Sequence, residues 1–210
     1  MKRYKIIHRT FYNYTKMVTL GAHQLLLRPR ENHELRIESF DLKISPEAKL
    51  MWHRDVEGNS VATASFSGET RQLAIESEVI IQQYNEVPLD FMVSDYAINY
   101  PFIYSEEDQI QLSPYRILPD EKTRVRLNNW IFESWKFDEQ VQSYTLLQRL
   151  TTRIYETMTY TVREEPGVQT SEQTLTLGSG SCRDFALLFM EAAKCLGLAT
   201  RFVSGYLHAP

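Results

Sequence analysis

The chain has 210 residues, of which 43% are hydrophobic and 24% are charged, and its formal net charge is −4. These proportions are ordinary for a folded globular protein and exclude long disordered tracts, collagen-like repeats and coiled coils. A net negative charge offers no global attraction for nucleic acid. No window approaches the run of about 18 to 20 apolar residues that a membrane-spanning helix needs. We therefore expect neither nucleic acid nor a membrane as a partner.

The cysteine count and the N-terminus bear on where the chain resides. Two cysteines are too few for the disulfide framework of a secreted domain. The opening MKRYKIIHRTF is basic but lacks the apolar stretch of a signal peptide, so we expect a cytoplasmic location. The basic residues of the first thirty positions are spaced like the solvated face of a sheet rather than as one nucleic-acid-binding patch: Lys2, Arg3, Lys5, Arg9, Lys16, Arg28 and Arg30.

The first half of the chain has the pattern of short antiparallel strands. Apolar and polar residues alternate from Tyr4 to Arg9 and again from Leu73 to Ile81, which is typical of half-buried strands. The turn-forming residues 55–59 separate a run ending at Trp52 from the run 61–66, which predicts a hairpin. Residues 1–112 are therefore predicted to form an antiparallel, sandwich-like β domain.

The pattern changes to a helical period after a proline-containing segment. Pro114 and Pro119 interrupt any helix or strand ladder, so residues 113–121 are the predicted linker. Residues 122–210 are then the predicted second domain. Its helical faces are marked by apolar residues three or four apart: Leu127, Ile131 and Trp135, then Leu147, Leu150, Ile154 and Met158.

The end of the chain predicts a loop, a helix and a strand in that order. Residues 167–181 are polar and contain glycine, which indicates a loop or one short helix. A helix is predicted from Cys182 to Leu196, ended by Gly197. The alternation from Ala199 to Leu207 predicts a strand. The expected fold class is thus α+β, with a β domain first and a mainly helical domain second.

Cys182 is the candidate catalytic residue because of its place at a helix start. Ser181 followed by Asp184 matches the capping-box spacing, which puts Ser181 at the N-cap and Cys182 at the first helical position. Backbone N–H groups there have no intrahelical partner, and the helix dipole is positive at that end. Both effects favour the thiolate, which is the nucleophilic form. The N–H of Cys182 is also placed to hold an oxyanion.

The neighbours of Cys182 supply further support for a nucleophile. Arg183 favours the anion, whereas the charge of Asp184 opposes it. Gly178 and Gly180 are expected to leave the approach open and to let a substrate backbone come close. The support set for the nucleophile and the oxyanion is therefore Gly180, Ser181, Arg183 and Asp184.

An alternative reading makes Cys182 a small apolar residue that happens to begin a helix, which is the usual role of a free cysteine. Cys195 offers a comparison, because it lies near the other end of the same helix, where the dipole disfavours an anion. The two sulfurs are separated by roughly 20 Å along an intact helix, so they cannot form a disulfide. The spacing is not CxxC, and no zinc site or other metal site is predicted.

The segment GSGSCRDFALLFMEAAKCLGLATRFVSGYL, residues 178–207, resembles the nucleophile region of the bacterial transglutaminase-like superfamily. The first half resembles the β-rich N-terminal domain of bacterial members. The matching features there are His8-x-Thr10-x-Tyr12-x-Tyr14, then Leu27-Arg28-Pro29-Arg30, then Asp55-x-x-Gly58-Asn59. The resemblance extends over essentially the whole chain.

The resemblance implies a papain-like fold and a Cys-His-Asp triad that performs acyl transfer on amides. It makes Cys182 the nucleophile of a cysteine peptidase, amidase or acyltransferase that acts on a protein or peptide substrate and needs no cofactor. Calcium is used by some animal relatives, but this sequence has no acidic loop of the EF-hand type. Residues 122–210 would then supply the helical half of the papain-like core.

The other two members of the triad are expected beyond the strand that ends near Leu207, in His-Ala-Trp and Asp-Pro contexts. His208 only echoes that motif, because it comes one strand too early. We assign no catalytic role to the remaining histidines, which all belong to the β domain: His8, His23, His33 and His53. The sequence therefore reads as truncated before the catalytic His and Asp, and we expect this chain alone to have little or no turnover.

A second hypothesis makes the chain a non-catalytic interaction module that keeps the fold without the triad. The β domain would then bind protein through its exposed strand edges. The predicted strand 199–207 would also expose an edge, through which the chain could form a homodimer. The acyl donor, the acceptor and the oligomeric state are left open by the sequence.

Overall fold

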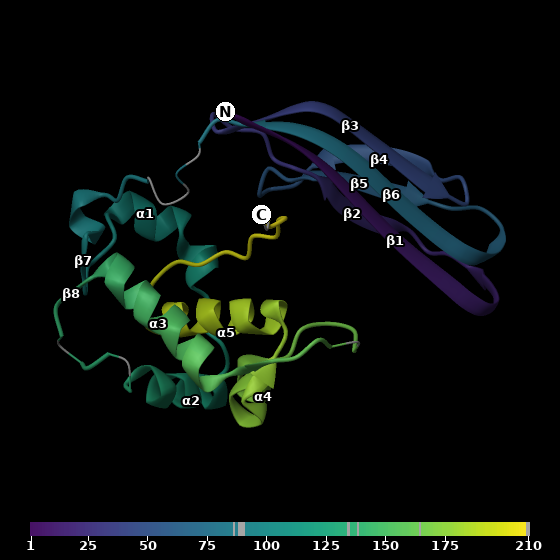
Figure 1. The fold of residues 1–210 in the computed structure, drawn as a ribbon. Helices are drawn as coiled ribbons and strands as arrows, with labels where there is room; N and C mark the ends of the chain where they lie inside the picture. Colours follow the sequence, from purple (N-terminus) through teal and green to yellow (C-terminus); the bar gives the residue numbers. More distant parts are fainter. Residues whose placement is uncertain (86, 88–90, 134, 138, 164, 209–210) are drawn as a thin grey trace. The chain divides into compact units, whose positions relative to one another are not determined.

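The computed structural model describes residues 1–210 except 86, 88–90, 134, 138, 164 and 209–210 (Figure 1). The chain divides into two compact units, Met1–Phe91 and Met92–Pro210. The first is all β and the second is mainly helical, so the α+β class predicted from the sequence is confirmed.

The first unit contains two antiparallel sheets of three strands each, in the orders β1-β6-β3 and β2-β5-β4. Their strands are β1 (Lys2–Thr19), β2 (His23–Arg28), β3 (Leu35–Ser45), β4 (Lys49–Arg54), β5 (Ser60–Ser65) and β6 (Glu69–Gln83). Leu73 and Ile75 of β6 pack against Leu25 and Leu27 of β2, so side chains of both sheets form one core. This packing gives the sandwich-like arrangement that we expected.

The alternating pattern and the hairpin behave as the sequence predicts. Every second residue of β6 from Leu73 to Ile81 is buried. The loop between β4 and β5 is organised by Asp55, whose carboxylate accepts hydrogen bonds from the backbone N–H groups of Glu57 and Asn59 at 2.9 and 2.8 Å. Gly58 in this loop has a φ of 76°, which glycine adopts without strain.

The second unit is built around the helix α5. Its α-helices are α1 (Glu106–Gln111), α2 (Glu121–Ile131), α3 (Ser143–Thr157), α4 (Ser171–Leu177) and α5 (Cys182–Cys195). Its short strands are β7 (Asn99–Tyr100), β8 (Val141–Gln142), β9 (Thr159–Tyr160) and β10 (Ser179–Gly180), and its 3₁₀ turns are η1 (Asp95–Ala97) and η2 (Ser113–Arg116). Helices α2, α3 and α4 all contact α5. The core is formed by apolar faces of α2, α3 and α5, represented by Leu127, Leu150 and Leu188, each fully buried.

The helical faces predicted from the sequence are confirmed, although the helices end before their predicted patterns do. Leu127 and Ile131 are buried on α2, and Leu150 and Ile154 on α3. Helix α2 ends at Ile131, yet Trp135 is still only 6% exposed and packs into the same core. Helix α5 ends one residue before the predicted Leu196 and is followed by Gly197 at a φ of 82°.

The boundary between the two units does not fall at the predicted linker. It lies after Phe91, and residues 113–121 belong to the second unit. Pro114 lies at the start of η2, and Asp120 caps α2 by accepting a hydrogen bond from the N–H of Thr123. The prolines therefore separate helices within one unit, because a proline is as compatible with the start of a helix as with a linker.

The strand predicted from Ala199 to Leu207 is not formed, so this prediction is wrong. The segment is an irregular trace after α5 (Figure 1), and the described part of the chain has no strand paired with it. Alternation alone does not make a strand, which needs a neighbour to accept its backbone hydrogen bonds. Instead, the N–H of Ala199 donates to the Tyr104 hydroxyl and that of Thr200 to the Tyr115 carbonyl. The predicted homodimer depended on the edge of this strand. The prediction remains untested, but the strand on which it was based is not formed.

Candidate active site

Cys182 is the first residue of α5, as the sequence predicts. Ser181 is the N-cap residue in an extended conformation, and Ser181 and Asp184 form the predicted capping box. The side chain of Cys182 is exposed. The thiol is therefore accessible and lies next to the unpaired N–H groups of a helix start.

The segment that leads into Cys182 is fixed by a short parallel pairing. Strand β10 pairs with β9, with Ser179 opposite Thr159 and Gly180 opposite Tyr160. The N–H of Thr159 donates to the Gly178 carbonyl at 2.8 Å, and the N–H of Thr161 donates to the Gly180 carbonyl at 2.9 Å. The backbone before Cys182 is thus held by hydrogen bonds on one side. In Figure 1, this start of α5 lies beside α4.

The structure explains why position 180 is a glycine, and the explanation differs from the one we expected. It is buried, and a Cβ at this position would lie 2.9 Å from the Cβ of Asp184 and 3.3 Å from a ring carbon of Phe185. The glycine therefore allows the chain to pass close to its own helix. Its expected role in leaving the approach open for a substrate backbone stays a prediction.

Asp184 is the centre of a buried network at the start of α5, two residues after Cys182 in the sequence. Its side chain is fully buried, and its carboxylate accepts hydrogen bonds from the backbone N–H groups of Ser181 and Gln169, each at 2.7 Å. The Ser181 hydroxyl donates to it at 2.8 Å. The Arg163 guanidinium lies 2.9 and 3.1 Å from its two oxygens. A carboxylate with this many donors is held in one orientation.

The same network decides the charge of Asp184. Burial raises the pKa of the carboxyl, but the hydrogen bonds from Ser181 and Gln169 and the contact with Arg163 outweigh this effect and lower the pKa to about 2. Asp184 is therefore an anion at neutral pH. Arg183, also predicted to support the nucleophile, has an exposed side chain.

Cys195, at the other end of α5, is in a different environment. Its side chain is half-buried, and this burial, together with the nearby charge of Glu191, raises the pKa of the thiol to about 11. Cys195 is therefore a protonated thiol at neutral pH. The two cysteines of one helix are in this way distinguished by exposure and by position relative to the helix dipole.

The histidines lie where the sequence suggested. His8 is half-buried on β1, with its Nε2 3.0 Å from the Thr10 hydroxyl, which agrees with a structural role. His208 has an exposed side chain in the irregular segment after α5. Within the described residues, no three side chains of His, Cys, Asp or Glu are grouped so that they could hold a metal ion. In that same part of the chain, no helix has the length and apolar character needed to cross a membrane.

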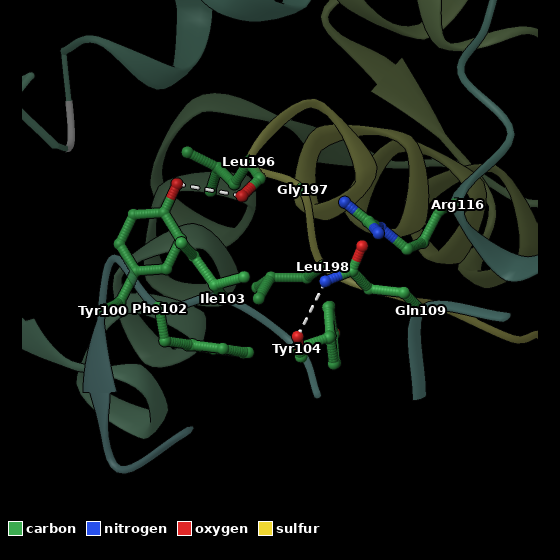
Figure 2. Close-up of a pocket in the computed structure, with 9 residues that line it drawn as sticks. All are labelled: Tyr100, Phe102, Ile103, Tyr104, Gln109, Arg116, Leu196, Gly197 and Leu198. Atoms are coloured by element: carbon green, nitrogen blue, oxygen red, sulfur yellow. Dashed lines mark hydrogen bonds between the residues drawn. The ribbon is translucent and has the colours of Figure 1, made fainter. Parts of the chain in front are cut away.

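A small pocket lies at the far end of α5 from Cys182. It has a volume of about 150 Å³ and is lined by residues of the segment 100–116 and by residues that follow α5: Tyr100, Phe102, Ile103, Tyr104, Gln109, Arg116, Leu196, Gly197 and Leu198. Figure 2 shows the Tyr100 hydroxyl donating to the Leu196 carbonyl, and the Gln109 amide donating to the Tyr104 carbonyl. Because it adjoins the C-terminal end of a 14-residue helix, the pocket is roughly 20 Å from Cys182.

Sequence reasoning found Asp184 but missed two of the residues that hold it. Arg163 is 21 positions away, and Gln169 contributes its backbone N–H, which carries no side-chain signal. The capping box places an acidic residue in the first turn of a helix, and a buried acid requires a cation. That requirement predicts an arginine or lysine partner, but only the fold identifies which one.

Comparison with known proteins agrees with this architecture. Residues 4–82 match the bacterial transglutaminase-like N-terminal region, and residues 136–210 match the transglutaminase-like superfamily. A crystal structure from Cytophaga hutchinsonii, described as a candidate cysteine protease, superimposes with a TM-score of 0.67 at 14% identity, over 94% of this chain and 64% of that one. At this identity the likeness shows the fold.

Uncharacterized proteins of Mycobacterium tuberculosis and Mycobacterium bovis are also similar, each 27% identical over 215 residues. The alignment covers 98% of this chain and 66% of each relative, so the chain spans slightly less than two thirds of their length. The two matching regions and the shared fold define a transglutaminase-like protein with a β-rich N-terminal region. The chain belongs to the transglutaminase-like superfamily.

Proposed function

We propose that the chain carries the nucleophile of a thiol enzyme that acts on peptide or side-chain amides. The observation that carries this proposal is the exposed Cys182 at the first position of α5. It lies two residues before a buried Asp184 whose carboxylate is held by hydrogen bonds. An exposed thiol at the positive end of a helix dipole is the arrangement that favours a reactive thiolate. The proposed substrate class, a protein or peptide, is the one that the resemblance to the superfamily implies.

The proposed chemistry is acyl transfer in two steps. The Cys182 thiolate attacks the carbonyl carbon of the amide, a C–S bond forms, and the oxygen takes up negative charge. Backbone N–H groups at the start of α5 stabilise that oxyanion. The C–N bond then breaks, the amine leaves with a proton, and water or a second amine later releases the acyl group from sulfur. By resemblance, a histidine oriented by an aspartate moves these protons; we assign neither role to a residue of this chain.

The first step can be tested by itself with an activated ester. p-Nitrophenyl acetate should acetylate Cys182 faster than Cys195, with release of p-nitrophenol, because this ester needs no general acid for its leaving group. Peptide mass spectrometry locates the acetyl group. Cys182→Ala should abolish the rapid acetylation, and Cys195→Ser should leave it unchanged. Equal, slow acetylation of both thiols would contradict the proposal.

The alternative function is a non-catalytic module that binds protein through a strand edge. The observation that favours it is the sheet order of the first unit, in which β1 and β3 are edge strands of 18 and 11 residues. Long edges can accept an added strand from a partner. Protein binding retained in Cys182→Ala, combined with an unreactive Cys182, would favour this function.

A further inference from the structure

The connection between β9 and α4 is attached to α5 through the side chain of Asp184. Arg163 lies near the start of this connection and Gln169 near its end, and both donate to the carboxylate of Asp184. The same carboxylate accepts from Ser181, the residue directly before Cys182. Asp184 therefore joins the connection, the N-cap and the first turn of α5.

Gln169 adds a second layer to this attachment. In the amide orientation that satisfies both ends of its side chain, its oxygen accepts from the Nε of Arg163 at 3.1 Å. Its nitrogen donates to the Ser179 carbonyl at 3.1 Å, in strand β10. The orientation of the Arg163 guanidinium is thus fixed by Asp184 on one side and by Gln169 on the other.

The ion pair between Arg163 and Asp184 is largely shielded from water. The side chain of Arg163 is 16% exposed and that of Asp184 is 0% exposed. Without Arg163 the carboxylate still accepts from the N–H groups of Ser181 and Gln169, which favour its charged form, but it loses the contact that fixes its orientation. This loss would loosen Ser181 and with it the position of Cys182.

The ion pair also affects the charge near the sulfur. Asp184 is two residues after Cys182, and a neighbouring anion disfavours a thiolate. The guanidinium of Arg163 offsets this repulsion, since it faces both carboxylate oxygens. Among the described residues, Glu165 is the other charged group paired with Arg163, 3.7 Å from its Nε and largely exposed.

We propose that Arg163 is a positioning residue for Cys182, which it serves through Asp184 by fixing the N-cap and offsetting the carboxylate charge. The inference rests on the proposed function of Cys182 as a nucleophile. Arg163 itself touches neither the sulfur nor, in this proposal, the substrate.

The test is the pH profile of Cys182 alkylation by iodoacetamide, followed by peptide mass spectrometry. In Arg163→Met, the rate at neutral pH should fall about three- to tenfold, and the pH of half-maximal rate should move upward, because the offsetting charge is lost. Arg163→Lys should recover part of the rate, since it restores the charge without the two-oxygen geometry. An unchanged profile in a folded Arg163→Met would overturn the proposal.

Two controls separate positioning from general damage. Arg126→Met removes another arginine of the same unit, which pairs with Glu172 at 3.2 Å on the surface, and should leave the profile unchanged. If Arg163→Met does not fold, Arg163→Gln carries the test, because it keeps a hydrogen-bond donor and loses only the charge. The same upward shift is expected, and an unchanged profile overturns the proposal.

The failure of this inference differs from failure of the proposed function. If wild-type Cys182 reacts no faster than an ordinary exposed thiol, the proposed function fails, and with it the inference. If wild-type Cys182 reacts rapidly and the Arg163 variants react equally rapidly, only the positioning role is refuted.

Discussion

The two ends of α5 hold the two cysteines of the chain in opposite settings. Cys182 is exposed at the N-terminal end, where N–H groups lack helical partners, and Cys195 is half-buried at the C-terminal end, where burial raises the pKa of its thiol to about 11. The difference shows that the reactivity of a cysteine is set by its place in the fold rather than by its residue type.

The largest expected effect is the loss of stability when Asp184, the anion that accepts hydrogen bonds at the N-terminal end of α5, is removed. Asp184→Ala leaves Arg163 without its partner and the N–H groups of Ser181 and Gln169 without an acceptor. It should lower the free energy of unfolding of the second unit by about 3–5 kcal/mol. Urea denaturation in a Trp52→Phe background measures this, because the remaining tryptophans lie in the second unit.

A surface charge serves as the control for that variant. Lys122→Ala removes an exposed ion pair with Glu172 and should change the free energy of unfolding by about 0.5 kcal/mol or less. Equal losses of unfolding free energy in Lys122→Ala and Asp184→Ala would contradict the conclusion that the buried network around Asp184 stabilises the second unit.

A smaller effect is expected where the chain passes close to its own helix. Gly180→Ala adds a Cβ 2.9 Å from that of Asp184 and should cost about 1–3 kcal/mol of unfolding free energy. The matched change Gly205→Ala meets nothing within 4 Å and should be close to neutral. If both variants unfold at the same urea concentration as the wild type, Gly180 is not required by packing.

The smallest expected effect is a change in thermal stability at acid pH. The pKa of Asp184 is lowered from 3.8 to about 2, so the stability that its charged form contributes is fully present above about pH 4 and is lost as the pH falls through 2. The difference in thermal midpoint between wild type and Asp184→Asn should thus be constant above pH 4 and shrink toward pH 2. A difference that grows as the pH falls below 6, or that stays unchanged down to pH 2, would contradict a lowered pKa of Asp184.

Local patterns in the sequence predict the position of Cys182 better than they predict the residues that hold Asp184 in place. The spacing of Ser181 and Asp184 places Cys182 at a helix start, and the alternation in β6 predicts its buried face, because both depend on neighbours a few residues apart. Arg163 lies outside any such local pattern. The strand predicted at 199–207 failed for the same reason, since pairing depends on residues far away in the sequence.

The most direct measurement is the ratio of iodoacetamide labelling rates at Cys182 and Cys195 at pH 7, in the native protein and in urea. Since each pKa unit changes the thiolate fraction tenfold, burial of Cys195 alone should make native Cys182 at least about tenfold faster. In urea both thiols are exposed and the ratio should fall close to one. Cys182 itself should also react faster in the native protein than in urea, because only the folded helix start favours its thiolate. A ratio near one in the native protein, or a Cys182 rate that urea does not lower, would contradict the central claim that the start of α5 presents an accessible and reactive sulfur.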